Sequence, residues 1–382
     1  MTESPTGEDR PRSRAARLSG NVLVFAFITL SILALVEGFS SLILFGWEAS
    51  RVSDVPSQVH AQYDTLLGWV NRPNVRLPDL YGEGKSLTTN ERSFRGTKPL
   101  PDVPAAGRIR LVCSGDSFTL GHGVGDEETW CALLERLDPR LETVNLGHAG
   151  YGIDQSYLLY EREASSLAHD VHVFAFIYDD FRRMGLRDFL SRPKPVLELR
   201  DGRPVAVGVP VPHRSRLAKW QVNAGVFMRL RSLELGQRAL ARISGRKQPR
   251  RAQRPEDHIP LALAAFEEVA ALDRSLGVRT LFVYLDMSAN ESRPAAAMGR
   301  LLEREMSARG LPFADLRTVF RALPHDSLHT LFDPEWQHYS SAGNRLVAGL
   351  LYERLEADSM VGPPAAIADL SEGRTSRPGS AR

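Results

Sequence analysis

The sequence predicts an α/β domain built on a doubly wound parallel sheet. Two observations predict this fold: five short segments are apolar at nearly every position, and longer segments with a helical period alternate with them. A strand that is apolar on both sides is buried on both faces, as in a parallel sheet that is covered by helices. We therefore expect helices on both faces of one central sheet.

The predicted elements follow one another from residue 108 to residue 357. The strands are the apolar runs at residues 108–113, 142–146, 171–178, 279–285 and 311–316. The helices are the segments at residues 129–137, 153–167, 261–276, 295–310 and 341–357. Because strands and helices alternate, we expect one domain over residues 108–357, with an insertion at residues 182–260.

The N-terminal region contains an apolar run at residues 21–47, which is longer than the ~20 residues that cross a bilayer. A cleaved signal peptide has an apolar core of about 7 to 15 residues and a small-x-small site behind it, so an uncleaved anchor is favoured here. Glu37 interrupts the run. Its carboxyl group either contacts a partner helix, or it is protonated or reaches the membrane–water interface. The basic tail of residues 1–20 predicts a cytoplasmic N-terminus and an extracytoplasmic domain. Its arginines are Arg10, Arg12, Arg14 and Arg17.

Three further segments lie outside the strand and helix alternation. Residues 48–107 are rich in Pro, Gly and Asn, which predicts a loop-rich lead-in with short strands. The insertion at residues 182–260 contains a basic segment with apolar residues at intervals. This pattern is typical of a helix that lies on an anionic membrane or binds an acidic polymer, and equally of a solvated helix that packs one face on the domain. We expect it to form a lid or a substrate wall. Residues 358–382 have little to bury and are expected to be disordered.

The composition excludes several classes of site. The 382 residues carry a formal net charge of +2, which gives no reason to expect a nucleic-acid partner. Two cysteines, Cys113 and Cys131, are too few for a disulfide framework or a cysteine metal site. They form either one disulfide in an oxidising compartment or two buried thiols.

Polar residues and glycines cluster where the predicted strands end. Ligands of an open parallel sheet bind beyond the carboxyl ends of its strands, so these residues are expected to share one site. They are Ser117 after the first strand, Gly147 and Gly150 after the second, Asp179 and Asp180 after the third, and Asp333, Glu335 and His338 before the final helix. A nucleophile, backbone donors, a polar side chain and an acid–base pair form a complete set for acyl transfer.

The order of these residues resembles a known family. The stretch "GDSFT" is similar to the first block of the GDSL, or SGNH, serine hydrolases, and "NLGHAGYG", "YDDF" and "HYSSAGN" stand in the order of the later blocks. The resemblance covers residues 108–357, and the lead-in resembles the segment that precedes this domain in membrane-anchored bacterial members. It implies a flavodoxin-like SGNH hydrolase fold with neither a cofactor nor a metal.

The resemblance also implies roles for individual residues. Ser117 is the expected nucleophile, His338 the expected general base, and the amides of Ser117 and Gly150 the expected oxyanion donors. His122 and His148 lie near the same blocks, but they are expected to line the pocket or the surface, and their spacing with His338 does not indicate a metal site.

Two positions depart from the family pattern. The family has an asparagine after the third strand, whose amide donates to the oxyanion, and this sequence has Asp179 there. A carboxylate donates only when it is protonated, so Asp179 belongs to the oxyanion hole only in its neutral form. The family acid stands three residues before the histidine, which is Glu335 here, whereas Asp333 stands five before; we favour Glu335 over Asp333.

These observations lead to two hypotheses about function. The first is an extracytoplasmic serine esterase or O-acyltransferase that acts on acyl esters, chiefly acetyl esters, of envelope carbohydrate through an acyl-enzyme on Ser117. The second is a catalytically degenerate SGNH-like module that binds acylated glycan or scaffolds an envelope complex, because Asp179 has spoiled the oxyanion hole. A nucleic-acid partner is part of neither hypothesis.

Overall fold

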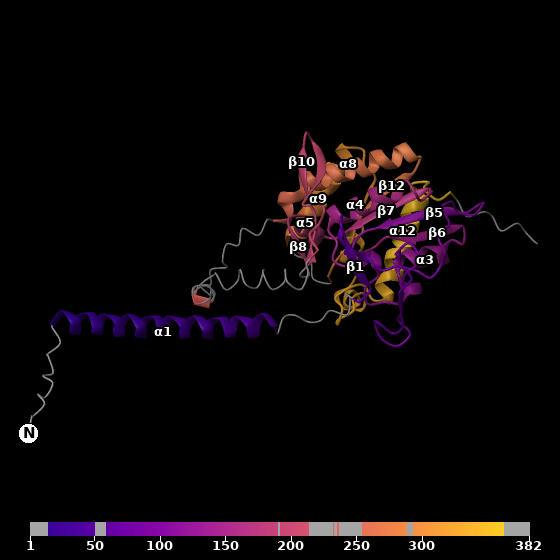
Figure 1. The fold of residues 1–382 in the computed structure, drawn as a ribbon. Coiled ribbons are helices and arrows are strands. Elements are labelled where there is room, and N and C mark those ends of the chain that lie inside the picture. The colour runs from indigo at the N-terminus through magenta and orange to yellow at the C-terminus, as the bar shows by residue number, and fades with distance from the viewer. Residues whose placement is uncertain are drawn as a thin grey trace, which may run out of the picture. The chain divides into compact units, whose positions relative to one another are not determined.

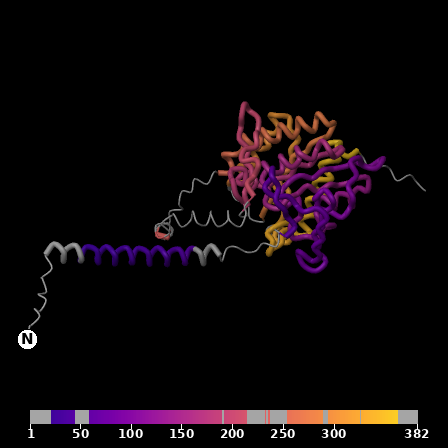
Figure 2. Tube along the Cα trace, viewed as in Figure 1, coloured from indigo at the N-terminus to yellow at the C-terminus, as the bar shows by residue number. Residues whose placement is uncertain are grey.

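The structure is a computed structural model, and it describes residues 14–49, 59–189, 192–213, 232, 235–236, 254–288 and 293–362 (Figure 1). Figure 2 shows the course of the Cα trace in the same view. The chain divides into two compact units, one made of residues 1–55 with 214–252 and the other of residues 56–213 with 253–382. Most of the basic segment of the insertion and the tail beyond residue 362 lie outside the described residues, so the predictions made for them stay predictions.

The first unit contains the long N-terminal helix α1 (Arg14–Ala49). Its segment Asn21–Leu44 is long and apolar enough to cross a membrane, a property that a signal sequence near the N-terminus can share. The predicted helix is therefore confirmed, and its passage through a membrane stays a prediction. Glu37 has a partner in the insertion, because the amide and the hydroxyl of Ser232 donate to its carboxylate at 3.1 and 2.7 Å.

A five-stranded parallel sheet forms the centre of the second unit (Figure 1). All five predicted strands and their parallel pairing are confirmed. Taken in chain order, the strands lie in the sequence 2-1-3-4-5 across the sheet, the doubly wound order whose crevice opens between the first and third strands. From one edge to the other they are β13 (Phe313–Asp315), β12 (Arg279–Tyr284), β7 (Val171–Phe176), β5 (Ile109–Ser114) and β6 (Leu141–Asn145).

The alternation of side chains along β7 explains why helices cover both faces. Phe174 and Phe176 belong to one apolar core, whereas Val173 and Ala175 belong to the other. The first core contains residues of α4 (Ile153–Ala164), α8 (Ile259–Leu276) and α9 (Arg293–Ala308), and the second contains residues of α3 (Trp130–Leu137) and α12 (Ser341–Ala357). The five predicted helices are confirmed.

Residues 59–107 of the lead-in belong to the same compact unit as the sheet. They form two short hairpins, β1 (Ala61–Asp64) with β2 (Gly68–Asn71) and β3 (Arg76–Leu77) with β4 (Leu87–Thr88). The indole of Trp69 donates to Ala149 O at 3.0 Å, and the hydroxyl of Tyr151 donates to Trp69 O at 2.5 Å. The lead-in therefore braces the glycine loop that follows β6.

The insertion begins with two hairpins that the sequence did not predict. They are β8 (Asp188–Phe189) with β9 (Arg192–Pro193), and β10 (Val196–Arg200) with β11 (Arg203–Val207). Between them the buried ammonium of Lys194 pairs with Asp154 of α4 and donates to Arg183 O at 3.0 Å.

Two more helices, α10 (Arg317–Ala322) and α11 (His325–Thr330), follow β13, and the turns η2 (Asp126–Glu128) and η3 (Pro255–His258) precede α3 and α8.

Candidate active site

The turn after β5 presents Ser117 at the start of the short helix α2 (Ser117–Leu120). Gly115 makes this turn possible, since a Cβ there would lie 2.2 Å from the Thr119 hydroxyl and 2.6 Å from Ala175 O. Asp116 caps the helix, because its carboxylate accepts a hydrogen bond of 2.8 Å from Phe118 N. The packing of this turn thus fixes the position of the Ser117 hydroxyl.

Ser117 and His338 are 221 positions apart in the sequence and lie in direct contact. The Ser117 hydroxyl oxygen lies 2.8 Å from His338 Nε2, and His338 Nδ1 lies 2.5 Å from Trp336 O. A carbonyl only accepts, so Nδ1 carries the hydrogen and Nε2 presents its lone pair to the serine. Burial lowers the pKa of His338, so the imidazole is neutral at neutral pH. This arrangement is that of a serine with its general base.

Neither acidic residue before His338 contacts the imidazole among the described hydrogen bonds. Asp333 instead accepts from the amides of Glu335 and Trp336 at 2.9 and 3.0 Å. Glu335 is exposed to solvent. The structure therefore places the Trp336 carbonyl at the imidazole, where the sequence led us to expect Glu335 or Asp333.

Asp179 lies at the start of α5 (Tyr178–Met184), and it is ionised. Its carboxylate accepts from the guanidinium of Arg182 at 2.6 and 2.9 Å and from Arg183 Nε at 3.0 Å. Burial raises its pKa, but the two arginines outweigh burial and hold that pKa below the usual range. An ionised carboxylate has no hydrogen to donate. The placement of Asp179 among the oxyanion donors is corrected for this reason.

Arg183 connects Asp179 to the nucleophile turn, and the sequence pattern did not single it out. Its Nη1 donates to Asp116 at 3.0 Å, to Asp180 at 2.8 Å and to Tyr151 O at 2.8 Å. Asp180 also accepts from Ile177 N at 3.0 Å, so it both caps α5 and pairs with Arg183. The i,i+3 and i,i+4 spacing of these aspartates and arginines is a signal that a helix prediction over α5 would have revealed.

The glycine loop after β6 lies against the nucleophile turn. A Cβ on Gly147 would lie 2.1 Å from Leu120 N, and His148 N donates to Gly115 O at 3.2 Å. Gly150 has a φ of +79°, which favours glycine. Neither the amide of Gly150 nor that of Ser117 has an acceptor among the described hydrogen bonds, so both are free to donate to a ligand.

Aromatic side chains surround the base. The rings of Phe118 and His122 lie 4.6 and 4.8 Å from the His338 ring, and Tyr81 and Trp336 pack against His122. Burial, with His338 as a second cause, lowers the pKa of His122 to about 3, so this imidazole is neutral. His122 therefore lines the site, as the sequence led us to expect, and adds no charge beside His338.

Arg95 of the lead-in is a second residue that no sequence pattern indicated. Its buried guanidinium donates to Leu120 O, Gly121 O and Val124 O at 2.5, 2.6 and 2.6 Å, and it pairs with Asp126 at 2.9 Å. These carbonyls belong to the segment directly after Ser117. Arg95 thus links the lead-in to the nucleophile turn.

The two cysteines are not paired in the structure. Cys113 and Cys131 are both buried and free. Burial, and the nearby thiol of Cys131, raise the pKa of Cys113 well above its usual value. In the part of the chain that the structure describes, no three His, Cys, Asp or Glu side chains are grouped as metal ligands.

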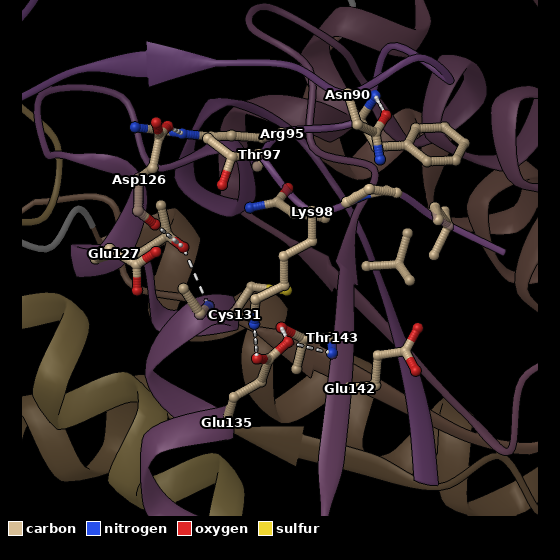
Figure 3. A pocket seen from close by; sticks show the side chains of 18 of the residues that line it. Asn90, Arg95, Thr97, Lys98, Asp126, Glu127, Cys131, Glu135, Glu142 and Thr143 are labelled. Carbon is tan, nitrogen blue, oxygen red and sulfur yellow. Dashed lines mark hydrogen bonds and ion pairs between the residues drawn. The ribbon is translucent and has the colours of Figure 1, made fainter. Parts of the chain in front are cut away.

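A cavity of about 400 Å³ lies beside the edge strand β6 (Figure 3). Lys98 and Glu135 pair within it, and Glu135 also accepts from the amide and hydroxyl of Thr143 at 2.7 and 3.0 Å. Its described lining includes neither Ser117 nor His338. The cavity is therefore separate from the candidate active site.

No family model matches the sequence, and no curated protein matches it. Similar solved structures include a protein from Desulfitobacterium hafniense assigned to the lipolytic G-D-S-L family, at 14% identity and a TM-score of 0.38, covering 64% of this chain and 99% of that one. A lipase/acylhydrolase from Enterococcus faecalis has 12% identity and a TM-score of 0.36, covering 65% and 96%. A GDSL-like lipase from Bacteroides thetaiotaomicron has 10% identity and a TM-score of 0.38, covering 68% and 93%. At identities and TM-scores this low, the activities of these proteins cannot be assigned to this chain.

Proposed function

We propose that this protein is a GDSL/SGNH-type serine ester hydrolase or acyltransferase with Ser117 as its nucleophile. The observation that carries the proposal is the 2.8 Å contact between the Ser117 hydroxyl and His338 Nε2, with Nδ1 held by the Trp336 carbonyl. A hydroxyl is a weak nucleophile at its ordinary pKa, and a neutral imidazole in this tautomer activates it.

The first half-reaction forms an acyl-enzyme. His338 Nε2 takes the proton of Ser117 as the hydroxyl oxygen attacks the ester carbonyl, and the carbonyl oxygen becomes an oxyanion. The amides of Ser117 and Gly150 donate to this oxyanion. The intermediate then collapses, the ester C–O bond breaks, and the imidazolium returns its proton to the departing alcohol.

The second half-reaction determines whether the protein hydrolyses or transfers. His338 takes a proton from water, or from the hydroxyl of an acceptor sugar, and the resulting oxygen nucleophile attacks the acyl carbon. Collapse of the second tetrahedral intermediate breaks the bond to Ser117, which regains its proton from the imidazolium. Water gives a free acid, and a sugar hydroxyl gives a new ester.

We further propose that the substrates are acyl esters, chiefly acetyl esters, of envelope carbohydrate. The candidate span Asn21–Leu44 and the arginines before it support an extracytoplasmic domain at the membrane surface. The sequence resemblance to membrane-anchored bacterial members supports the same setting. A reporter fused after Ala357 tests the location, since activity of the reporter in the cytoplasm would contradict this topology.

A binding module is the second candidate function, and two observations favour it. Asp179 is an ionised acceptor at the family's donor position, and neither the Asp333 nor the Glu335 carboxylate contacts the His338 imidazole among the described hydrogen bonds. Such a module would bind acylated glycan without turning it over.

Labelling with a fluorophosphonate probe separates the two functions. An active serine hydrolase forms a covalent adduct on Ser117, which mass spectrometry of the peptide locates. The Ser117→Ala variant is the matched control and should neither label nor hydrolyse p-nitrophenyl acetate. Folded wild-type protein that stays unlabelled and inert would rule out the enzyme and leave the binding module.

A further inference from the structure

The proposed reaction lacks one donor that the family pattern supplies. Two amides, those of Ser117 and Gly150, are free to bind the oxyanion, and Asp179 cannot be the third donor because it is ionised. Loss of one oxyanion donor costs about 10² to 10³ in kcat in enzymes of this kind. A replacement donor close to the same place would restore this factor.

Arg183 lies where a replacement is needed. Its guanidinium contacts Asp116, the residue before the nucleophile, and Tyr151 O, in the residue after Gly150. Its Nε contacts Asp179, at the family's donor position. The Ser117 hydroxyl lies 3.4 Å from the same Asp116 oxygen that accepts from Arg183 at 3.0 Å. A single carboxylate oxygen thus separates the guanidinium from the nucleophile.

The hydrogen-bond inventory of Arg183 leaves donors for a ligand. A guanidinium has five N–H groups, of which one is on Nε and two are on each terminal nitrogen. Nε is used by Asp179, and Nη1 is shared among Asp116, Asp180 and Tyr151 O. No described group accepts from Nη2, and this nitrogen is not among the fully buried polar atoms that lack a partner. The Nη2 edge of a side chain that is only 9% exposed therefore reaches solvent.

We propose that Arg183 is a catalytic residue whose Nη2 donates to the oxyanion in place of the missing asparagine, an inference that rests on the proposed function. The positive charge stabilises the anion as it develops, and it remains because a guanidinium keeps its proton throughout. Asp116 and Asp179 act as positioning residues, since their carboxylates fix the planar fork from two sides.

This assignment explains why an aspartate is useful at position 179. A carboxylate accepts both from Arg183 Nε and from Arg182, as the structure shows, and it compensates the charge of an arginine that is nearly buried. An asparagine would donate to the oxyanion itself but would hold the guanidinium less firmly. The site has therefore exchanged a neutral donor for a charged one.

The test compares Arg183→Met with Arg182→Met on p-nitrophenyl acetate, a neutral ester. Arg182 is the matched control because it is the neighbouring arginine, it also pairs with Asp179, and its side chain is 42% exposed. We expect Arg183→Met to lower kcat, and the rate of fluorophosphonate labelling, by about 10² to 10³ with a smaller change in KM. Arg182→Met should stay within about threefold of wild type, well below the tenfold that corresponds to about 1.4 kcal/mol.

A double variant makes the test independent of folding. Arg183→Met leaves Asp116 and Asp180 without their guanidinium and changes the net charge of the site, which can unfold the protein. The additional change Asp179→Asn removes one negative charge, which returns the net charge of the site to that of wild type, and it restores the family's amide donor. We expect the double variant to fold and to recover at least tenfold in kcat over Arg183→Met, or, if that variant does not fold, to come within about tenfold of wild type.

Four outcomes would overturn the assignment in distinguishable ways. A folded Arg183→Met with wild-type kcat shows that Ser117 works without Arg183. A folded double variant that stays inert, although wild type is active, shows that the arginine did not replace an amide donor. Wild-type protein that neither labels nor hydrolyses removes the proposed function together with this inference. A rise in KM for anionic esters alone would make Arg183 a substrate-carboxylate binder and refute the oxyanion role.

Discussion

The absence of a carboxylate on His338 among the described contacts leads to a quantitative prediction. Where a triad aspartate bonds to the imidazole, its conversion to asparagine lowers kcat by about 10⁴. Here the Trp336 carbonyl holds Nδ1 at 2.5 Å, and the Asp333 carboxylate makes no hydrogen bond to the imidazole, so its direct effect on the ring is that of its charge. We therefore expect Asp333→Asn to lower kcat by less than about tenfold, which is ~1.4 kcal/mol of barrier. Glu335→Gln should stay within about twofold, because Glu335 is exposed and any effect of its charge is screened.

A second substitution at position 333 separates charge from structure. Asp333 accepts hydrogen bonds of 2.9 and 3.0 Å from the amides of Glu335 and Trp336, and an asparagine oxygen can accept both. Alanine accepts neither, so Asp333→Ala loses about 1 kcal/mol for each bond and loosens the turn that carries the Trp336 carbonyl. We expect Asp333→Ala to lower kcat by about 10- to 100-fold, clearly more than Asp333→Asn.

The assay is steady-state hydrolysis of p-nitrophenyl acetate from pH 5 to 9, with thermal unfolding of each variant as the control for folding. A base must be neutral to act, and burial lowers the pKa of His338, so kcat/KM should rise with pH through an apparent pKa below 6.5 and then level off. A drop of 10³ or more in kcat for folded Asp333→Asn would refute this reasoning, since it would mean that the carboxylate reaches the imidazole during turnover.

Three further changes test the scaffold of the site. Arg95→Met leaves three carbonyls after the nucleophile without their donor, at about 1–3 kcal/mol each, so Tm and kcat should both fall; unchanged kcat would show that this clamp is dispensable. Gly147→Ala should lower Tm because its Cβ would lie 2.1 Å from Leu120 N, whereas Gly349→Ala in α12 meets no atom within 4 Å and should leave Tm equal or higher. Three buried histidines bind protons more readily in the unfolded chain than in the folded one, so the free energy of unfolding should fall as the pH falls from about 6.5 towards 4. The loss is up to ~1.4 kcal/mol per pH unit for each histidine. Thermal unfolding measured against pH tests this, and a flat profile would contradict it. The histidines are His60, His122 and His148, with pKa values lowered to about 4, 3 and 4.

The sheet and its main helices could be predicted because the sequence encodes them locally. The strand at residues 171–178 is apolar on both sides, so it had to lie between two layers of helices. Ligands bind beyond the carboxyl ends of parallel strands, and this rule predicted that Ser117 and the glycine loop after β6 lie at the same edge of the sheet. The short helices α5, α10 and α11 were missed because six or seven residues give too little periodicity to identify a helix.

The groups that orient the site were missed for another reason. The partner of His338 Nδ1 is a backbone carbonyl, and the backbone is the same at every position of a sequence. Arg95 lies in a lead-in that reads as loops, and its role depends on carbonyls about thirty positions away. Neither contact leaves a side-chain pattern, so only the folded chain reveals them.

The protonation state of Asp179 shows how two opposing effects set the pKa of one carboxyl group. Burial raises a carboxyl pKa, and only a protonated Asp179 could donate to an oxyanion. The same helix contains Arg182 and Arg183, which one helical turn places against the carboxylate, and their charges outweigh burial. The guanidinium of Arg183 also contacts Asp116 and Asp180, which join the same network. The nucleophile turn is thereby tied by charge to α5 through Arg183, so removing the charge of Arg183 should alter activity and stability together.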